Sequence, residues 1–148
     1  MKKILIIIFC FLTGCGYQSI YIGQNKSDFV FKNINLIGDK SINKKIIFAL
    51  NLREDKSNQN LNEIILNTSK TVVEISKNSK GQIASYRTTV QLNLIIKKNG
   101  KQLKNKNFTE SFSYNNMDNK FNLSSYQNEV EKNLTDKIIE ELIIYLSV

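Results

Sequence analysis

The residue with the most definite chemistry in this sequence is Cys15, which ends the run Leu12-Thr13-Gly14-Cys15. A thiol preceded by small residues suits lipoprotein maturation, because the sulfur takes a diacylglyceryl thioether and the small neighbours let a peptidase reach the bond before it. Two lysines and a short apolar run precede this motif, and the run falls short of the about 20 residues that span a bilayer. The sequence therefore predicts a lipoprotein signal peptide over residues 1–14, with Cys15 as the acylated first residue of the mature chain.

Two other interpretations of the same segment are an ordinary signal peptide with an incidental cysteine and a short membrane anchor. The order of basic residues, apolar run, small residues and cysteine favours the lipoprotein. Gly16, rather than aspartate, follows the cysteine. Under the sorting rule of enterobacterial lipoproteins, this favours release to the outer membrane.

The rest of the chain offers little catalytic or metal-binding chemistry. It contains no histidine, and its other cysteine, Cys10, lies in the predicted signal peptide. We find no glycine-rich phosphate loop, no nucleophile elbow, and no cysteine or histidine pair at metal-ligand spacing. The sequence thus predicts no enzyme, no cofactor and no metal site; a hydrolase would need a serine, a lysine and a carboxylate brought together by the fold.

The charge balance indicates which partners to expect. The formal net charge is +8, and removal of the two lysines of the signal peptide leaves +6. Because an exported, lipid-anchored chain does not meet chromosomal DNA, anionic lipid or glycolipid is favoured over nucleic acid. Most of the lysines are expected on a solvated surface.

The sequence predicts three segments: the signal peptide (1–14), a lipidated tether (15–27) and a single domain (28–148), which is long enough for one modest core. Alternating apolar and polar residues predict a strand over Asp28–Ile37. Helical spacing from Ile42 to Arg53 predicts a helix that is capped by Asp39 or Ser41 and ends near Asp55-Lys56.

Three long strands are then predicted, with turns at residues 78–81 and at Asn99-Gly100. Their bounds are Glu63–Lys77, Gln82–Lys98 and Lys101–Asn115. A final helix capped by Ser124 or Ser125 would carry an apolar stripe from Leu123 to Tyr145, with Glu131 among the residues on its wet face.

This order of elements, β-α-β-β-β-α, predicts an α+β two-layer sandwich. One face of the long strands alternates as polar, so the four-stranded sheet should have helices on a single side. A helix after the first strand favours parallel pairing of that strand with a later one. We therefore expect a mixed, mostly antiparallel sheet with both helices packed on one face.

The whole mature chain resembles the LPS-assembly lipoprotein family, LptE or RlpB. The resemblance is carried by Leu12–Tyr17 at the anchor, Ala84–Val90 (ASYRTTV) opening a long amphipathic strand, the aromatic-polar strand Phe108–Tyr114, and a terminal helix that closes with Glu141–Leu146. The order of elements and the chain length match as well. The chain departs from the family in Gln18–Tyr21, which lacks the Arg-Gly or Arg-Asp pair of many members.

The resemblance implies a protein on the periplasmic side of the outer membrane that plugs a large β-barrel translocon (LptD-type) and promotes lipopolysaccharide assembly. Family residues that touch this ligand lie in loops at one end of the sheet, which in this chain corresponds to Lys77, Lys80 and Lys120. Charge-assisted hydrogen bonds from these lysines would meet the lipid A phosphates. The alternative function is an auxiliary or substrate-binding lipoprotein of an envelope lipid-transport system, which should offer an apolar pocket for a lipid tail.

Overall fold

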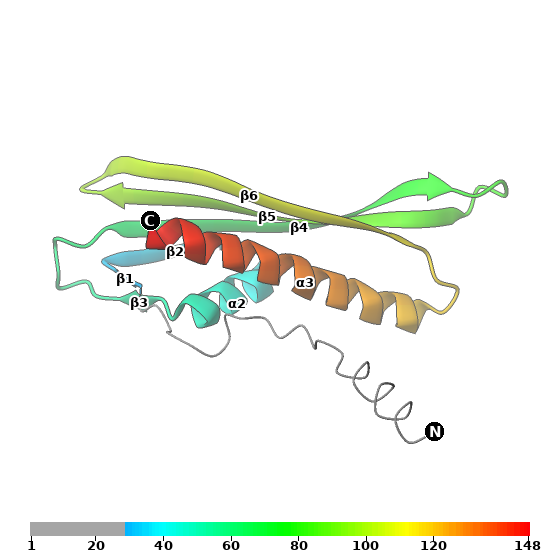
Figure 1. Ribbon diagram of the computed structural model, residues 1–148, viewed down its shortest axis with the longest axis horizontal. Coiled ribbons are helices and arrows are strands. Elements are labelled where there is room, and N and C mark those ends of the chain that lie inside the picture. The colour runs from blue at the N-terminus through cyan, green and yellow to red at the C-terminus, as the bar shows by residue number, and fades with distance from the viewer. Residues whose placement is uncertain (1–28) are drawn as a thin grey trace, which may run out of the picture.

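The computed structural model describes residues 29–148 (Figure 1). The predicted signal peptide, the tether and Cys15 lie outside these described residues, so they stay predictions. Among residues 29–148, no helix is both long enough and apolar enough to cross a membrane.

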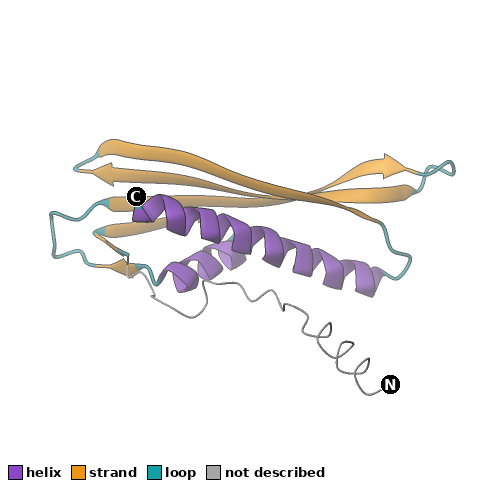
Figure 2. Ribbon diagram, in the orientation of Figure 1, coloured by secondary structure: helices purple, strands orange, loops and turns teal. Residues whose placement is uncertain are grey.

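A mixed sheet and two helices form two layers, and both helices pack on the same face of the sheet (Figure 2). The sheet has four strands in the order β2-β4-β5-β6, with β2 parallel to β4 and the other neighbours antiparallel. This confirms the predicted α+β architecture. The elements are β1 (Val30–Phe31), β2 (Asn33–Gly38), α2 (Lys40–Leu50), β3 (Arg53–Glu54), β4 (Glu63–Lys77), β5 (Ile83–Lys98), β6 (Lys101–Asn115) and α3 (Lys120–Ser147).

The three long strands agree with their predicted bounds, β5 beginning one residue later than expected. Asn99 and Gly100 both have positive φ, 49° and 77°, which matches the mirror-image turn that joins antiparallel strands in a tight hairpin. The predicted first strand is broken at Lys32 into β1 and β2, which join different sheets.

Period-two alternation places the core on the helix side of the sheet. Ile64 and Leu66 of β4 are fully buried, and so are Leu94 of β5 and Ile138 and Leu142 of α3. The predicted apolar stripe of the last helix is confirmed by this packing. Burial of such side chains is worth about 1.5–3 kcal/mol each, which makes this layer the main source of stability.

The first helix ends earlier than predicted. Asp39 caps it, because its carboxylate accepts hydrogen bonds from the backbone N–H groups of Ser41 and Ile42 at 2.9 and 3.1 Å. The other end is at Leu50, since Asn51 adopts the left-handed conformation (φ 46°) that terminates helices. The predicted end near Asp55-Lys56 is wrong, because the chain beyond Asn51 forms β3, which pairs in parallel with β1.

The last helix begins earlier than predicted, at Lys120. Asn119 is its N-cap, with a side-chain oxygen 2.9 Å from the backbone nitrogen of Phe121 and 3.2 Å from that of Asn122. Ser124 and Ser125, the predicted caps, lie inside the helix. Asparagine is as good an N-cap as serine, so the capping-box spacing identified the wrong residue.

Gly38 marks the point where β2 turns into α2. Its φ is +89°, and a Cβ at this position would lie 1.8 Å from the backbone oxygen of Thr68 on β4. Buried Asn43 of α2 stabilises the same corner, because it donates to the Ile37 oxygen at 3.1 Å and accepts from the Thr68 hydroxyl at 3.0 Å. The junction therefore depends on a residue without a side chain.

Candidate functional site

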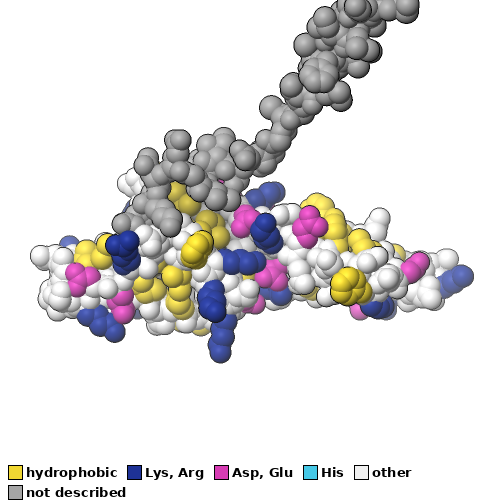
Figure 3. Space-filling model, turned by 90° about the horizontal axis from the view of Figure 1, so that it is seen from below, with side chains coloured by type: hydrophobic (Ala, Val, Ile, Leu, Met, Phe, Trp, Pro, Cys, Tyr) yellow, Lys and Arg dark blue, Asp and Glu magenta, His cyan; other side chains and the backbone are white. Residues whose placement is uncertain are grey.

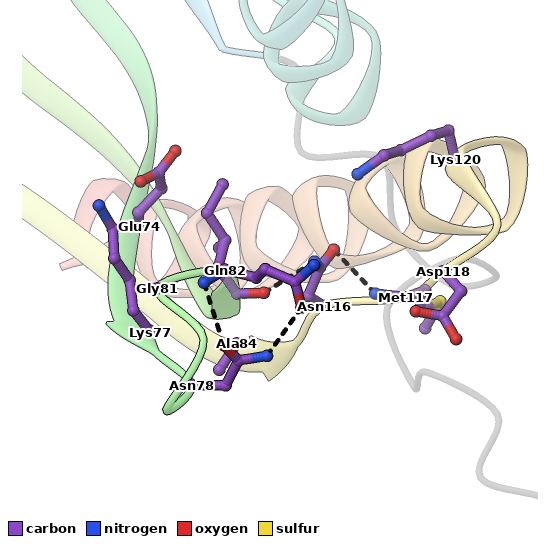
Figure 4. Close-up of a pocket in the computed structure, with 11 residues that line it drawn as sticks. Glu74, Lys77, Asn78, Gly81, Gln82, Ala84, Asn116, Met117, Asp118 and Lys120 are labelled. Atoms are coloured by element: carbon purple, nitrogen blue, oxygen red, sulfur yellow. Dashed lines mark hydrogen bonds between the residues drawn. The ribbon is translucent and has the colours of Figure 1, made fainter.

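The structure brings two of the three candidate lysines to one groove. This groove, of about 720 Å³, lies between the β4–β5 hairpin and the start of α3, at the right-hand end of the molecule in Figure 1. Lys77 lines it from β4 and Lys120 lines it from α3, on opposite sides (Figure 4). Lys80 lies in the hairpin turn and is exposed, but it does not line the groove.

Two asparagines hold the groove in shape. The side-chain oxygen of Asn78 accepts from the backbone nitrogens of Lys80 and Gln82, each at 3.0 Å, which fixes the hairpin turn. Asn116 reaches back from the β6–α3 connection and donates from its side chain to the Ile83 oxygen at 2.9 Å (Figure 4). The Asn78 bonds lie within the hairpin, and the Asn116 bond joins the connection before α3 to the start of β5.

Carboxylates line the same groove. Glu74 lies beside Lys77 on β4, and Asp118 lies just before α3 (Figure 4). A phosphate in the groove would be attracted by the lysines and repelled by these carboxylates, so the position of the ligand along the groove would be restricted. Sequence reasoning missed both acids, because nothing in their local spacing indicates that they line the same groove as the lysines.

The outer face of the sheet, opposite the helices, carries many amides and hydroxyls, together with the apolar side chains of Ile65, Val73 and Ile95. Asn93 donates to the side-chain oxygen of Asn105 at 2.9 Å, and Arg87 donates to the Ser113 hydroxyl at 3.1 Å. Ser69 and Gln91 also bond across the strands, at 3.4 Å. We call the polar side chains joined by these bonds, which lie on the outer side of β4, β5 and β6, the polar sheet face.

A charged cluster links α3 to the sheet and to the other helix. Glu131 of α3 lies 2.6 Å from the Lys70 ammonium of β4 and 3.8 Å from the Lys45 ammonium of α2. The hydrogen bond to Glu131 raises the pKa of Lys70 above its usual value. Glu131 is buried, so its predicted place on the wet face is wrong: two lysines distant in sequence compensate its charge.

The helix side of the molecule mixes lysines, carboxylates and apolar side chains (Figure 3). Within residues 29–148, no three histidine, cysteine, aspartate or glutamate side chains gather as a metal site would require. The described features are thus a charged groove, a polar sheet face and a structural ion-pair cluster. They suit binding of polar, charged molecules.

Comparison with known proteins finds the same fold in solved structures of lipoproteins. No protein-family model and no curated protein sequence matches the chain. Among solved structures, rare lipoprotein B from Shewanella oneidensis superposes with a TM-score of 0.55 at 12% identity, covering 78% of this chain and 96% of that one. The chain shares the fold of rare lipoprotein B.

Two further lipoproteins show the same architecture. The minor lipoprotein from Acinetobacter baumannii gives a TM-score of 0.52 at 14% identity, covering 77% of this chain and 89% of that one. Lipoprotein B from Nitrosomonas europaea gives 0.53 at 10% identity, covering 81% and 84%. The resemblance to the LptE/RlpB family is thereby confirmed in its fold.

Proposed function

We propose that this protein is an outer-membrane lipoprotein, acylated at Cys15 and facing the periplasm, that partners a large β-barrel translocon and promotes lipopolysaccharide assembly. Its role is binding and assembly rather than catalysis. The observation that carries the proposal is the fold shared with rare lipoprotein B, which extends over 96% of that chain. The run Leu12-Thr13-Gly14-Cys15, a lipobox, is the predicted site of the lipid anchor that a lipoprotein needs.

The polar sheet face supports a barrel partner. The lumen of an outer-membrane barrel is polar and wet, so a plug inside it needs a hydrophilic surface. Amide and hydroxyl side chains such as Gln91, Asn93 and Ser113 both donate and accept hydrogen bonds, so they can pair with a polar wall or with bridging water. The apolar core lies on the other side of the sheet, where the helices cover it.

The groove supports a phosphate-bearing ligand. Lys77 and Lys120 approach it from opposite walls, and Lys80 adds a charge at the hairpin tip. Ammonium groups form charge-assisted hydrogen bonds with phosphate oxygens, which are about twice as strong as neutral ones. Lipid A carries such phosphates, and the three lysines are the residues we propose to meet them.

The experiment that tests the proposed function is purification of the tagged full chain from membranes in mild detergent, with mass spectrometry of the proteins that accompany it. We expect a large β-barrel protein in stoichiometric amount, and loss of assembled barrel when the chain is depleted. Recovery of inner-membrane transport components would instead support the auxiliary lipid-transport function. Recovery of the acylated chain alone, with barrel assembly normal after depletion, contradicts the proposal.

A further inference from the structure

A long open edge of the sheet lies beside the groove, and Glu74 and Lys77 belong to both features. β2 pairs with β4 only as far as Gly38, which lies opposite Thr68, whereas β4 continues to Lys77. Figure 1 shows β4 running on past the end of β2. Within the described part of the chain, residues 69–77 have no strand on this side.

Backbone groups of alternate residues point to this open edge. The Asp39 nitrogen donates to the Thr68 oxygen at 3.1 Å, so the backbone of Thr68 faces the β2 side of the strand. N–H and C=O groups alternate in direction along a strand, so those of Lys70, Val72 and Glu74 face the same side. The odd-numbered residues between them direct theirs toward β5.

The side chains along this edge are open and partly apolar. Val72, Val73 and Ile75 are 43%, 49% and 41% exposed. Sheet edges are commonly protected by charged side chains, above all by lysine, which hinder strand addition. The first seven residues of β6, on the opposite edge of the sheet, include three lysines, whereas the β4 edge has Lys70 and Lys77 near its two ends and a valine at its centre.

We propose that this edge pairs with the same edge of a second copy of the chain. In an antiparallel pairing centred on Val72, this residue lies opposite its own counterpart, and Lys70 lies opposite Glu74 of the second copy. Thr71 then lies opposite Val73. Opposite charges and β-branched residues in facing positions are the pairs that stabilise antiparallel strands. A strand that complements itself in this way forms a two-fold symmetric interface.

The backbone geometry agrees with the same register. Lys70, Val72 and Glu74 face the open edge, so each can exchange both backbone hydrogen bonds with the residue opposite it. The register is irregular between Glu74 and Ser76 and again between Ser76 and Lys77. Such bulges bend a strand, which lets the hairpin end diverge from Gly38 of the second copy.

The resulting dimer has one continuous sheet with all helices on one side. Because the two-fold axis is perpendicular to the sheet at Val72, the polar sheet faces of both copies form one surface. Lys70 then lies between Glu131 of its own chain, which it already contacts at 2.6 Å, and Glu74 of the second copy. The core and the helix packing of each chain are unchanged.

Disulfide trapping tests the register directly, using the mature acylated chain in mild detergent without lipopolysaccharide. The Cα atoms of a hydrogen-bonded antiparallel pair lie about 5.5 Å apart, within the about 4.4–6.8 Å that a disulfide accepts. Val72→Cys is therefore expected to form a covalent dimer under mild oxidation. In Val73→Cys, the two introduced cysteines would lie about 8 Å apart, so this neighbouring and equally exposed position should not cross-link. The acylated wild-type chain serves as the control, because its Cys15 sulfur is held in a thioether and cannot form a disulfide.

Charge reversal tests the pairing independently. Glu74→Lys places two lysines opposite each other, and we expect at least a tenfold weaker dimer in analytical ultracentrifugation, with an unchanged thermal melt. Glu141→Lys makes the same charge change at an exposed position of α3 and should leave the dimer intact. A wild-type chain that stays monomeric at all concentrations overturns the proposal, as does equal cross-linking at positions 72 and 73. The chain would also stay monomeric if its N-terminal segment or another protein occupied the edge. That result would refute self-pairing as well.

Discussion

Replacing Gly38 by alanine is expected to destabilise the protein far more than the same replacement at Gly81. Both residues have positive φ, +89° and +76°, so each alanine incurs the left-handed backbone strain of about 1–2 kcal/mol. At Gly81 nothing lies within 4 Å of the added Cβ, whereas at Gly38 the Cβ would lie 1.8 Å from the Thr68 oxygen. That oxygen belongs to the backbone of a central strand and accepts a hydrogen bond from the Asp39 nitrogen. Moving it away from the added Cβ would break this hydrogen bond and distort β4.

We therefore expect Gly38→Ala to cost more than about 3 kcal/mol, because β2 must separate from β4 or the α2 junction must shift. In a domain of this size, 1 kcal/mol lowers the melting temperature by about 3–5 °C. Thermal and urea unfolding followed by circular dichroism should show a fall of more than about 10 °C for Gly38→Ala and about 3–10 °C for Gly81→Ala. Equal effects at the two positions would refute the geometry of the β2–α2 junction.

Three further predictions follow from the charged groups and the anchor. Glu131→Gln should lower the free energy of unfolding by about 1–2 kcal/mol at pH 7 in urea titrations, a value reduced by the partial exposure of Lys70. Because the pKa of Lys70 is raised from 10.5, the difference between wild type and variant should hold below about pH 10 and shrink as the pH rises through the folded-state pKa. Lys77→Glu should weaken lipopolysaccharide binding about five- to tenfold in a salt-dependent manner, while Lys98→Glu at the other end of the sheet leaves it unchanged. Cys15→Ser should abolish the incorporation of labelled fatty acid into the chain, and a variant labelled as strongly as the wild type would contradict acylation at Cys15.

The long strands were predictable because their signals are local and agree with one another. The alternation along Ile83–Lys98 distinguishes the two faces of the sheet, and Asn99-Gly100 fixes the hairpin that follows. The mixed sheet with both helices on one side follows from that alternation and from the strand-helix order.

The ends of the helices were harder to predict because they depend on competing local choices. The helical spacing continues past Leu50 to Arg53, yet the left-handed conformation of Asn51 ends α2, and pairing of the next residues with β1 gives them an alternative structure. Asn119 and the serines at 124 and 125 are all good N-caps, so the sequence does not decide between them; the structure has Asn119 as the N-cap and Leu123 inside α3.

The candidate site could be predicted only in part, since it depends on contacts between distant residues. Lys77 and Lys120 do share a groove, but Glu74 and Asp118 join them there. Helical periodicity predicts that Glu131 lies on the solvent-exposed face of the helix. It cannot indicate that a lysine on β4 compensates a buried carboxylate.

The measurement that tests the central claim most directly is intact-mass and N-terminal peptide mass spectrometry of the native protein from the envelope. The account predicts a mature chain that begins at Cys15, with a diacylglyceryl thioether on its sulfur and fatty acyl chains that hold it in the membrane. An unmodified chain that begins at Met1 would contradict the lipid anchor, the outer-membrane location and the barrel partnership together.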